Sequence, residues 1–213
     1  MLASRCCFAI VSTSRVPCFR RIPRSWFGWT SSHRSMASSK LPFGFVYDER
    51  MLKHECKYDP TMAECPERIS LVHQRLLKEG QLKGALQIPA REATDDELLL
   101  NHPKELIAEL EAIHNDKEAE DFCRNKEILW ACENSMEAAR LAAGGSIDIV
   151  KACVEGRTIY LSQKNVHFRI DNGFAIVRPP GHHSWGAMPQ GYCIFNNVAV
   201  AAKYAVEIMG VKR

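Results

Sequence analysis

The 213-residue sequence lacks several features that would assign it to a specialised class of protein. No apolar run approaches the roughly 20 residues that a membrane-spanning helix needs, and there is no internal repeat or long low-complexity tract. The formal net charge is only +3, and its surplus lies near the N-terminus. We therefore expect one domain with an ordinary core, and neither a membrane nor nucleic acid as a direct partner.

Cysteine is present, but without the paired spacing of a disulfide framework or a zinc motif. The nine cysteines are scattered, which favours reduced thiols in an intracellular protein. A small structural zinc site is an alternative, built from Cys56, Cys65, His54 and His73. The spacing of these residues matches no common zinc pattern, and Cys65-Pro66 is more typical of the start of a helix.

Acidic residues are absent before Asp48. The same stretch combines serines with six arginines, which is typical of a mitochondrial transit peptide: Arg5, Arg15, Arg20, Arg21, Arg24 and Arg34. Met36 also suits the start of a cytosolic protein, so the residues before it form either a leader or an upstream extension. Under both interpretations residues 1–40 are a leader-like or disordered extension, and the fold is expected over residues 41–213.

The strongest functional signal is the hexapeptide Arg178-Pro179-Pro180-Gly181-His182-His183. It follows the apolar run 174–177, which predicts a buried strand that ends in a catalytic loop. The two prolines fix their φ angles and the glycine frees the next position, so a stiff backbone holds both imidazoles. Ligands bind at the carboxyl ends of strands in open parallel sheets, and histidine exchanges protons near neutral pH. The alternative is an ordinary loop that carries two histidines.

Together with two motifs that follow it in order, this hexapeptide resembles the zinc-dependent histone deacetylase family. The likeness is closest to the class IIb type, which includes the tubulin deacetylases. The two motifs are Gly191-Tyr192-Cys193-Ile194-Phe195-Asn196-Asn197 and the small-residue stretch 198–205. Weaker upstream segments, such as residues 64–69, extend the resemblance from about Phe43 to Gly210. It implies an α/β fold, with a parallel sheet flanked by helices as in arginase.

The resemblance also implies an activity, the hydrolysis of acetyl-lysine in histones or in cytoplasmic proteins such as tubulin. A zinc ion would lower the pKa of its bound water to about 7. His183 would serve as general base and then acid, with His182 as its electrostatic partner. The Gly191 carbonyl would accept a hydrogen bond from the substrate amide, and Tyr192 would form a wall of the acetyl-lysine tunnel.

The zinc ligands of the family find no match within this sequence. They are an Asp-x-His pair and a later aspartate, and they are expected beyond Arg213. We therefore expect residues 41–213 to be the N-terminal portion of a catalytic domain, truncated after its first part and inactive alone. The competing hypothesis is a non-catalytic fragment that binds partners or does not fold independently.

The resemblance further implies partners and a location. The substrates would be acetylated proteins such as histone tails, with corepressor or cytoskeletal proteins as possible partners. The expected location is the cytoplasm and nucleus, and the arginine-rich N-terminus makes mitochondria the alternative.

Local patterns predict the elements around this motif. Residues 44–47 form a short apolar run, typical of a first strand. A helix is expected from Pro66 to Gly80, and a capping box of Thr94 and Glu97 predicts the start of another. The apolar faces expected for the first helix and for a third, which begins at Pro103, are Ile69, Val72, Leu76 and Leu77, and Leu106, Ile107, Leu110 and Ile113.

Less regular segments follow. The charged stretch 117–126 predicts a solvated helix surface or loop, and Ser135 is expected to cap a helix over 136–143 that Gly144-Gly145 breaks or bends. Residues 157–170 lie where family members have a shorter connection. One interpretation is that residues 158–161 pair as an edge strand. The alternative is that the whole segment is translated from a retained intron.

Overall fold

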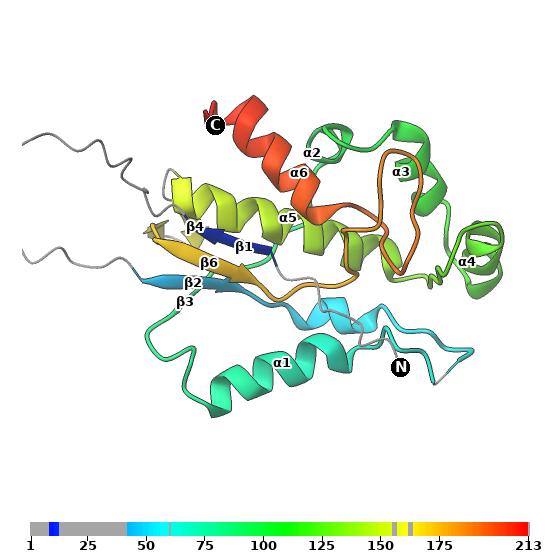
Figure 1. Cartoon of the computed structure of the whole chain (residues 1–213), viewed down its shortest axis with the longest axis horizontal. Helices are drawn as coiled ribbons and strands as arrows, with labels where there is room; N and C mark the ends of the chain where they lie inside the picture. The colour runs from blue at the N-terminus through cyan, green and yellow to red at the C-terminus, as the bar shows by residue number, and fades with distance from the viewer. Residues whose placement is uncertain (1–8, 13–41, 60, 155–156, 162–163, 213) are drawn as a thin grey trace, which may run out of the picture.

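The computed structural model describes residues 9–12, 42–59, 61–154, 157–161 and 164–212. Its centre is a four-stranded sheet in the order β1-β6-β2-β3. The strands are β1 (Ala9–Ser12), β2 (Phe43–Val46), β3 (Leu86–Gln87) and β6 (Asn172–Ala175). Strands β2, β3 and β6 are parallel, and helices α1 (Glu67–Lys78) and α5 (Ser135–Val154) cover opposite sides of the sheet (Figure 1). The expected α/β fold with a parallel sheet flanked by helices is confirmed.

The first strand and helix form where the sequence predicts them. Helix α1 begins directly after Pro66, and Gly80 has a φ of 68° just beyond its end. Ile69 is buried against the sheet, but Leu77 is 55% exposed, so its predicted place on the buried face is wrong. Leu77 lies one residue after Leu76, which packs on the core, and successive helical residues point about 100° apart.

The capping box forms as expected. The Glu97 N–H donates to Thr94 Oγ1 (3.3 Å), and the Thr94 N–H donates to the Glu97 carboxylate (2.9 Å), at the start of α2 (Asp95–Leu99). Helix α3 (Lys104–Glu111) follows Pro103 and buries its predicted apolar face. Helix α4 (Asp116–Cys123) occupies much of the segment expected to be solvated, yet it buries Phe122 and Cys123. A mostly charged sequence therefore still supplies one apolar helix face.

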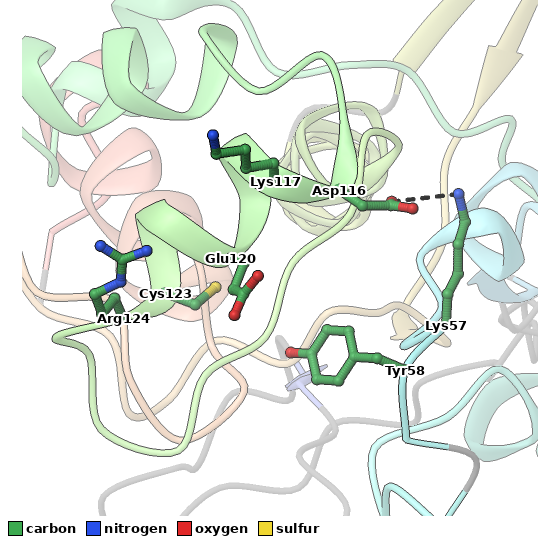
Figure 2. Close-up of a pocket in the computed structure, with 7 residues that line it drawn as sticks. All are labelled: Lys57, Tyr58, Asp116, Lys117, Glu120, Cys123 and Arg124. Atoms are coloured by element: carbon green, nitrogen blue, oxygen red, sulfur yellow. Dashed lines mark hydrogen bonds and ion pairs between the residues drawn. The ribbon is translucent and has the colours of Figure 1, made fainter.

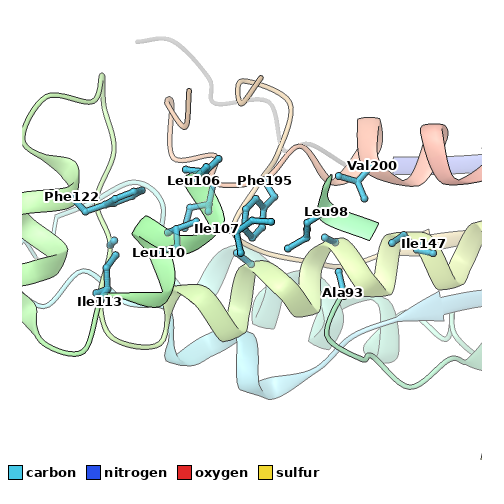
Figure 3. Close-up of a cluster of buried hydrophobic side chains, with 14 of the residues drawn as sticks. Ala93, Leu98, Leu106, Ile107, Leu110, Ile113, Phe122, Ile147, Phe195 and Val200 are labelled. Atoms are coloured by element: carbon cyan, nitrogen blue, oxygen red, sulfur yellow. The ribbon is translucent and has the colours of Figure 1, made fainter. Parts of the chain in front are cut away.

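The largest hydrophobic cluster ties the segment after the histidine pair to the helices (Figure 3). Ile194 and Phe195 are completely buried in this cluster. Their partners include Leu106 and Leu110 of α3 and Ile147 of α5. Residues 178–196, which carry the histidine pair and form the histidine loop, are therefore anchored at their downstream end by apolar burial.

Helix α5 runs unbroken through Gly144 and Gly145, so the predicted break or bend is wrong. Residues 91–93 cross the helix at this point. A Cβ atom on Gly144 would collide with the Arg91 carbonyl and lie 2.8 Å from the Ala93 nitrogen. Glycine is needed for this close approach rather than for a bend. Ser135 is the first residue of the helix rather than its cap.

Two segments differ from the sequence-based expectations. Residues 1–40 were expected outside the fold, but β1 pairs with β6 in antiparallel register, from Ala9 opposite Ala175 to Ser12 opposite Asn172. An edge strand has unpaired backbone groups, which β1 satisfies. The remainder of residues 1–40, and with it the choice of start at Met1 or Met36, lies outside the described residues.

The second segment is the insertion at 157–170. Strands β4 (Arg157–Leu161) and β5 (Lys164–Phe168) form a separate two-stranded antiparallel sheet. A strand therefore forms at 158–161, one of the two alternatives left open by the sequence, but it pairs with β5 and does not extend an edge of the main sheet.

Shorter elements complete the fold. A 3₁₀ turn, η1 (Glu49–Lys53), follows β2. Helix α6 (Asn197–Lys203) continues into the π-helical turn η2 (Tyr204–Ile208) and lies along α5 (Figure 1). Across the described ranges, no helix combines the length and apolar character needed to span a bilayer.

We expect Gly144→Ala to lower the free energy of unfolding by about 3 kcal/mol, although alanine normally favours a helix interior by about 0.5–1 kcal/mol over glycine. The added methyl group would meet the backbone of residues 91–93. The matched control is Gly145→Ala, whose Cβ would meet a Val46 side-chain methyl at 2.8 Å and should cost less, because a side chain gives way more easily than backbone. Urea unfolding followed by circular dichroism measures both. Unchanged stability in Gly144→Ala would contradict the proposed contact.

Candidate active site

The histidine loop leaves the carboxyl end of β6, as the sequence predicts. The Ile176 N–H donates to the Val46 carbonyl (2.9 Å) before the chain turns into Arg178 and the two prolines. Gly181 does not use its conformational freedom in the way expected from the Pro-Pro-Gly corner, because its φ is not positive. A Cβ at Gly181 would instead lie 2.7 Å from the Phe195 carbonyl. The glycine lets the two ends of the loop approach each other.

Arg178 fixes the start of the loop through a buried ion pair. Its guanidinium donates to both carboxylate oxygens of Glu64, at 3.0 Å and 2.7 Å, and each residue is 1% exposed. It also donates to the carbonyls of Met51 (3.0 Å) and His54. This bidentate pair neutralises both charges inside the protein, where an unpaired charge would be very costly.

His54 lies beside this pair. Its Nδ1 is 2.8 Å from Ser135 Oγ, its Nε2 is 3.7 Å from a Glu64 oxygen, and its ring stacks on Trp130 at 4.1 Å. Burial, and then the charge of Arg178, hold the pKa of His54 well below its ordinary value of 6.5. The Ser-His-Glu arrangement has the composition of a hydrolase triad, but all three residues are at most 1% exposed, which excludes substrate. Its role is structural.

The two histidines of the motif are exposed side by side. The ring centroids of His182 and His183 are 3.8 Å apart, with an angle of 41° between the planes. Partial burial, followed by the neighbouring His183 and Arg68, lowers the pKa of His182. His182 is therefore neutral at pH 7, and the pair does not carry two positive charges. Such a pair can accept and return one proton.

His183 lines a cavity of about 260 Å³, together with Glu127, Ile128, Gln190 and Gly191. Gly191 has a φ of 55°, and a Cβ there would lie 2.8 Å from the His183 ring. Only glycine therefore combines this backbone conformation with this distance from the imidazole. Gln190 Nε2 donates to the His183 carbonyl (2.9 Å) and holds the same turn.

The connection between α4 and α5 forms the other side of this cavity. The Gly191 N–H donates to the Glu127 carbonyl (3.0 Å), and the Tyr192 N–H donates to the Ile128 carbonyl (2.8 Å). Tyr192 has a φ of 66°, which is uncommon for a residue other than glycine. The structure thus brings His182, His183 and Gly191 together and adds Glu127 and Ile128, while Tyr192 follows Gly191 in the chain. The roles expected for Gly191 and Tyr192 toward substrate stay predictions.

Comparison with known proteins agrees with this geometry. A family model described as the histone deacetylase domain matches residues 62–213. The chain belongs to the histone deacetylase family. It is 35% identical to Histone deacetylase 18 of Arabidopsis thaliana over 171 residues, and the aligned segment covers 78% of this chain and 23% of that protein. It is 34% identical over 172 residues to Polyamine deacetylase HDAC10 of Mus musculus, covering 79% and 24%.

A solved structure supports the same assignment. The crystal structure of the HDA15 HD domain aligns with a TM-score of 0.64 and 30% identity, over 82% of this chain and 46% of that one. The chain spans about a quarter of the length of its histone deacetylase relatives and about half of the solved domain.

Metal ligands are not assembled in the part of this histone deacetylase chain that the structure describes. No group of three or more His, Cys, Asp and Glu side chains there could hold a metal ion. The alternative zinc site of Cys56, Cys65, His54 and His73 is therefore not formed: His54 stacks on Trp130, and His73 stacks on Tyr47. The described residues do not fit a catalytic zinc ion.

His102 binds the backbone of the histidine loop at two positions. This role was not identified from the sequence. The Asn196 N–H donates to His102 Nε2 (2.9 Å), so Nδ1 carries the proton and donates to the Gly186 carbonyl (2.7 Å). Burial is the largest cause of its lowered pKa, which keeps the ring neutral. Its position before Pro103 predicted only a helix start, because both partners lie more than eighty residues later in the chain.

Two exposed apolar residues lie within the loop, after the histidine pair. Trp185 and Met188 are 61% and 49% exposed, and their backbones exchange hydrogen bonds of 3.2 Å and 2.9 Å in a tight turn. Cys193 is buried in this loop, consistent with a packing role.

A larger cavity of about 680 Å³ lies apart from the histidine pair, between the loop at Lys57 and Tyr58 and helix α4 (Figure 2). A Lys57–Asp116 ion pair of 3.4 Å crosses its edge. Burial raises the pKa of Cys123, which lines this cavity, to about 12, so its thiol is protonated and a poor nucleophile. Cavity size alone therefore does not locate the chemistry, and the smaller cavity beside His183 is the candidate site.

We expect Arg178→Met to destabilise the protein by about 3–5 kcal/mol, because it leaves the Glu64 carboxylate buried without its cation. The control is Arg75→Met, which removes an exposed pair with Glu79 on α1 and should cost less than about 1 kcal/mol. Urea unfolding of both variants provides the comparison. Equal effects would mean that burial of the Arg178 pair has no special energetic weight.

Stability should fall as the pH drops below 6.5. The folded-state pKa of His54 is lowered, so between that pKa and 6.5 the unfolded chain binds the proton more readily. Each such histidine contributes a slope of up to about 1.4 kcal/mol per pH unit. His54→Gln should reduce the slope, while substitution of the exposed His114 by glutamine should leave it unchanged. Urea unfolding between about pH 5 and pH 7.5 measures the slopes. Equal slopes in all three proteins would refute the assignment to His54.

Proposed function

We propose that this chain supplies the histidine loop of a zinc-dependent hydrolase that removes acetyl groups from lysine in histones or in cytoplasmic proteins such as tubulin. The observation that carries the proposal is the exposed His182–His183 pair, with His183 on a cavity whose opposite side is held by residues 127–128. Acylated polyamines are a second substrate class, because the similar proteins include a polyamine deacetylase.

Under this proposal His183 takes a proton from the attacking water and later gives it to the departing amine. The neutral His182, whose ring centroid is 3.8 Å from that of His183, is its electrostatic partner and orients the scissile carbonyl. Gly191 lies beside the His183 ring, and under the proposal its carbonyl, which accepts from Cys193 Sγ (3.4 Å), also accepts from the amide of a bound substrate. The zinc ion expected from the family would be held by residues other than those described.

The proposed location is the cytoplasm and nucleus, with mitochondria as the alternative. A fluorescent fusion that begins at Met1 should match one that begins at Met36 if residues 1–35 carry no address. Mitochondrial signal from the longer fusion alone would favour a transit peptide.

The proposal is tested by joining this chain to the part of Arabidopsis Histone deacetylase 18 that follows the aligned segment. We expect the hybrid to release acetate from acetyl-lysine peptides in a zinc-dependent manner, and His183→Ala to lower kcat about 10²- to 10⁴-fold, as for the loss of a general acid-base group. His114→Ala, a substitution of an exposed histidine outside the loop, is the control and should leave the rate unchanged.

One result would count against the role of His183, and another against the expectation that the chain is inactive alone. Full activity of the hybrid after His183→Ala would remove His183 from the reaction. Zinc-dependent acetate release by the 213-residue chain alone, lost on His183→Ala, would contradict the expectation that these residues are insufficient. Binding of acetyl-lysine by an inactive hybrid would instead support a binding module.

A further inference from the structure

Ile128 lies on the cavity beside His183 with a backbone conformation that isoleucine rarely adopts. Its φ is 48°, in the left-handed region, where a β-branched residue is an outlier. Among the residues that the structure describes, Tyr192 is the other non-glycine residue with a positive φ. The two are joined by the hydrogen bond from the Tyr192 N–H to the Ile128 carbonyl. Unusual backbone geometry is therefore concentrated at this cavity.

The surrounding structure holds Ile128 in this conformation from both directions. Two residues later, Trp130 is 2% exposed and stacks on His54, which anchors the chain in the interior. On the other side, the carbonyls of Glu127 and Ile128 accept consecutive N–H groups from residues 191 and 192. The segment is thus fixed between the buried network and the histidine loop.

Packing of the Ile128 side chain does not explain why isoleucine occupies this position. The side chain is 61% exposed, so little of its apolar surface is removed from water. Glycine or asparagine adopts a left-handed conformation with less strain. Strained residues of this kind cluster at ligand sites, where the surrounding structure maintains them.

We infer that Ile128 is a specificity-determining residue, whose side chain forms the apolar wall along which the unbranched methylene stem of an acylated amine lies. This inference rests on the proposed function. The other groups on the cavity are Glu127, His183, Gln190 and Gly191, none of which supplies an aliphatic branched surface. A substrate stem of CH₂ groups needs such a surface to leave water, while its acyl amide needs the polar groups.

The test is a titration of the ¹⁵N-labelled 213-residue chain with Nε-acetyl-lysine amide, with amide shifts followed at residues 190 and 191. Ile128→Gly and Ile128→Asn should each weaken binding by about fivefold to tenfold, because the apolar wall is lost. Their thermal midpoints should equal or exceed that of the original chain by up to about 5 °C, because the strain is relieved. Ile128→Val keeps a β-branched wall and should bind within about twofold of the original.

The control is Ile208→Asn on η2, since Ile208 is 59% exposed and does not line this cavity. It should leave binding unchanged. Unaltered binding in Ile128→Gly and Ile128→Asn, or a lowered midpoint in both, would overturn the inference while leaving the proposed function intact. If the original chain binds acetyl-lysine amide no better than lysine amide, the inference about Ile128 fails, while acetate release by the hybrid decides the proposed function separately.

Discussion

A guanidinium and a carboxylate, both almost completely buried, hold the histidine loop on the body of the protein. Arg178 lies between β6 and the two prolines, and Glu64 lies just before α1. Since Arg178 also donates hydrogen bonds to the carbonyls of Met51 and His54, one side chain connects its own strand end with the segments at 51–54 and at Glu64. Neither charge is tolerable in the interior without the other. The position of His182 and His183 therefore depends on how the segment before α1 folds.

Much of the fold was predictable because its signals are local. The capping box at Thr94, the helix start after Pro66 and the first strand each depend on a few adjacent residues. The errors arose where distant segments meet. Gly144 looks like a helix breaker in sequence, but the crossing of residues 91–93 makes it a contact point. No local sequence pattern predicts that crossing, because the two segments are about fifty residues apart in the chain.

The site was predictable in part for the same reason. The histidine pair and Gly191 belong to motifs that are continuous in sequence, and the structure places His183 and Gly191 on one cavity. Glu127 and Ile128 have no such motif. They reach the site only through backbone hydrogen bonds to residues 191 and 192, and their carbonyls carry no information about side-chain identity. His102 was missed because both of its hydrogen-bond partners, although adjacent in space, lie more than eighty residues later in the sequence.

The pairing of the main sheet also constrains the order of events during synthesis. Strand β6 lies between β1 and β2, yet it is made after more than a hundred further residues have left the ribosome. Until then β2 has only the two-residue β3 beside it, and β1 has no strand in this sheet to join. Closure of such long loops slows folding and prolongs the exposure of unpaired strands. During synthesis the nascent chain therefore exposes β1 and β2 without their main partner for a long interval, and this is when chaperones would shield its unpaired strands most.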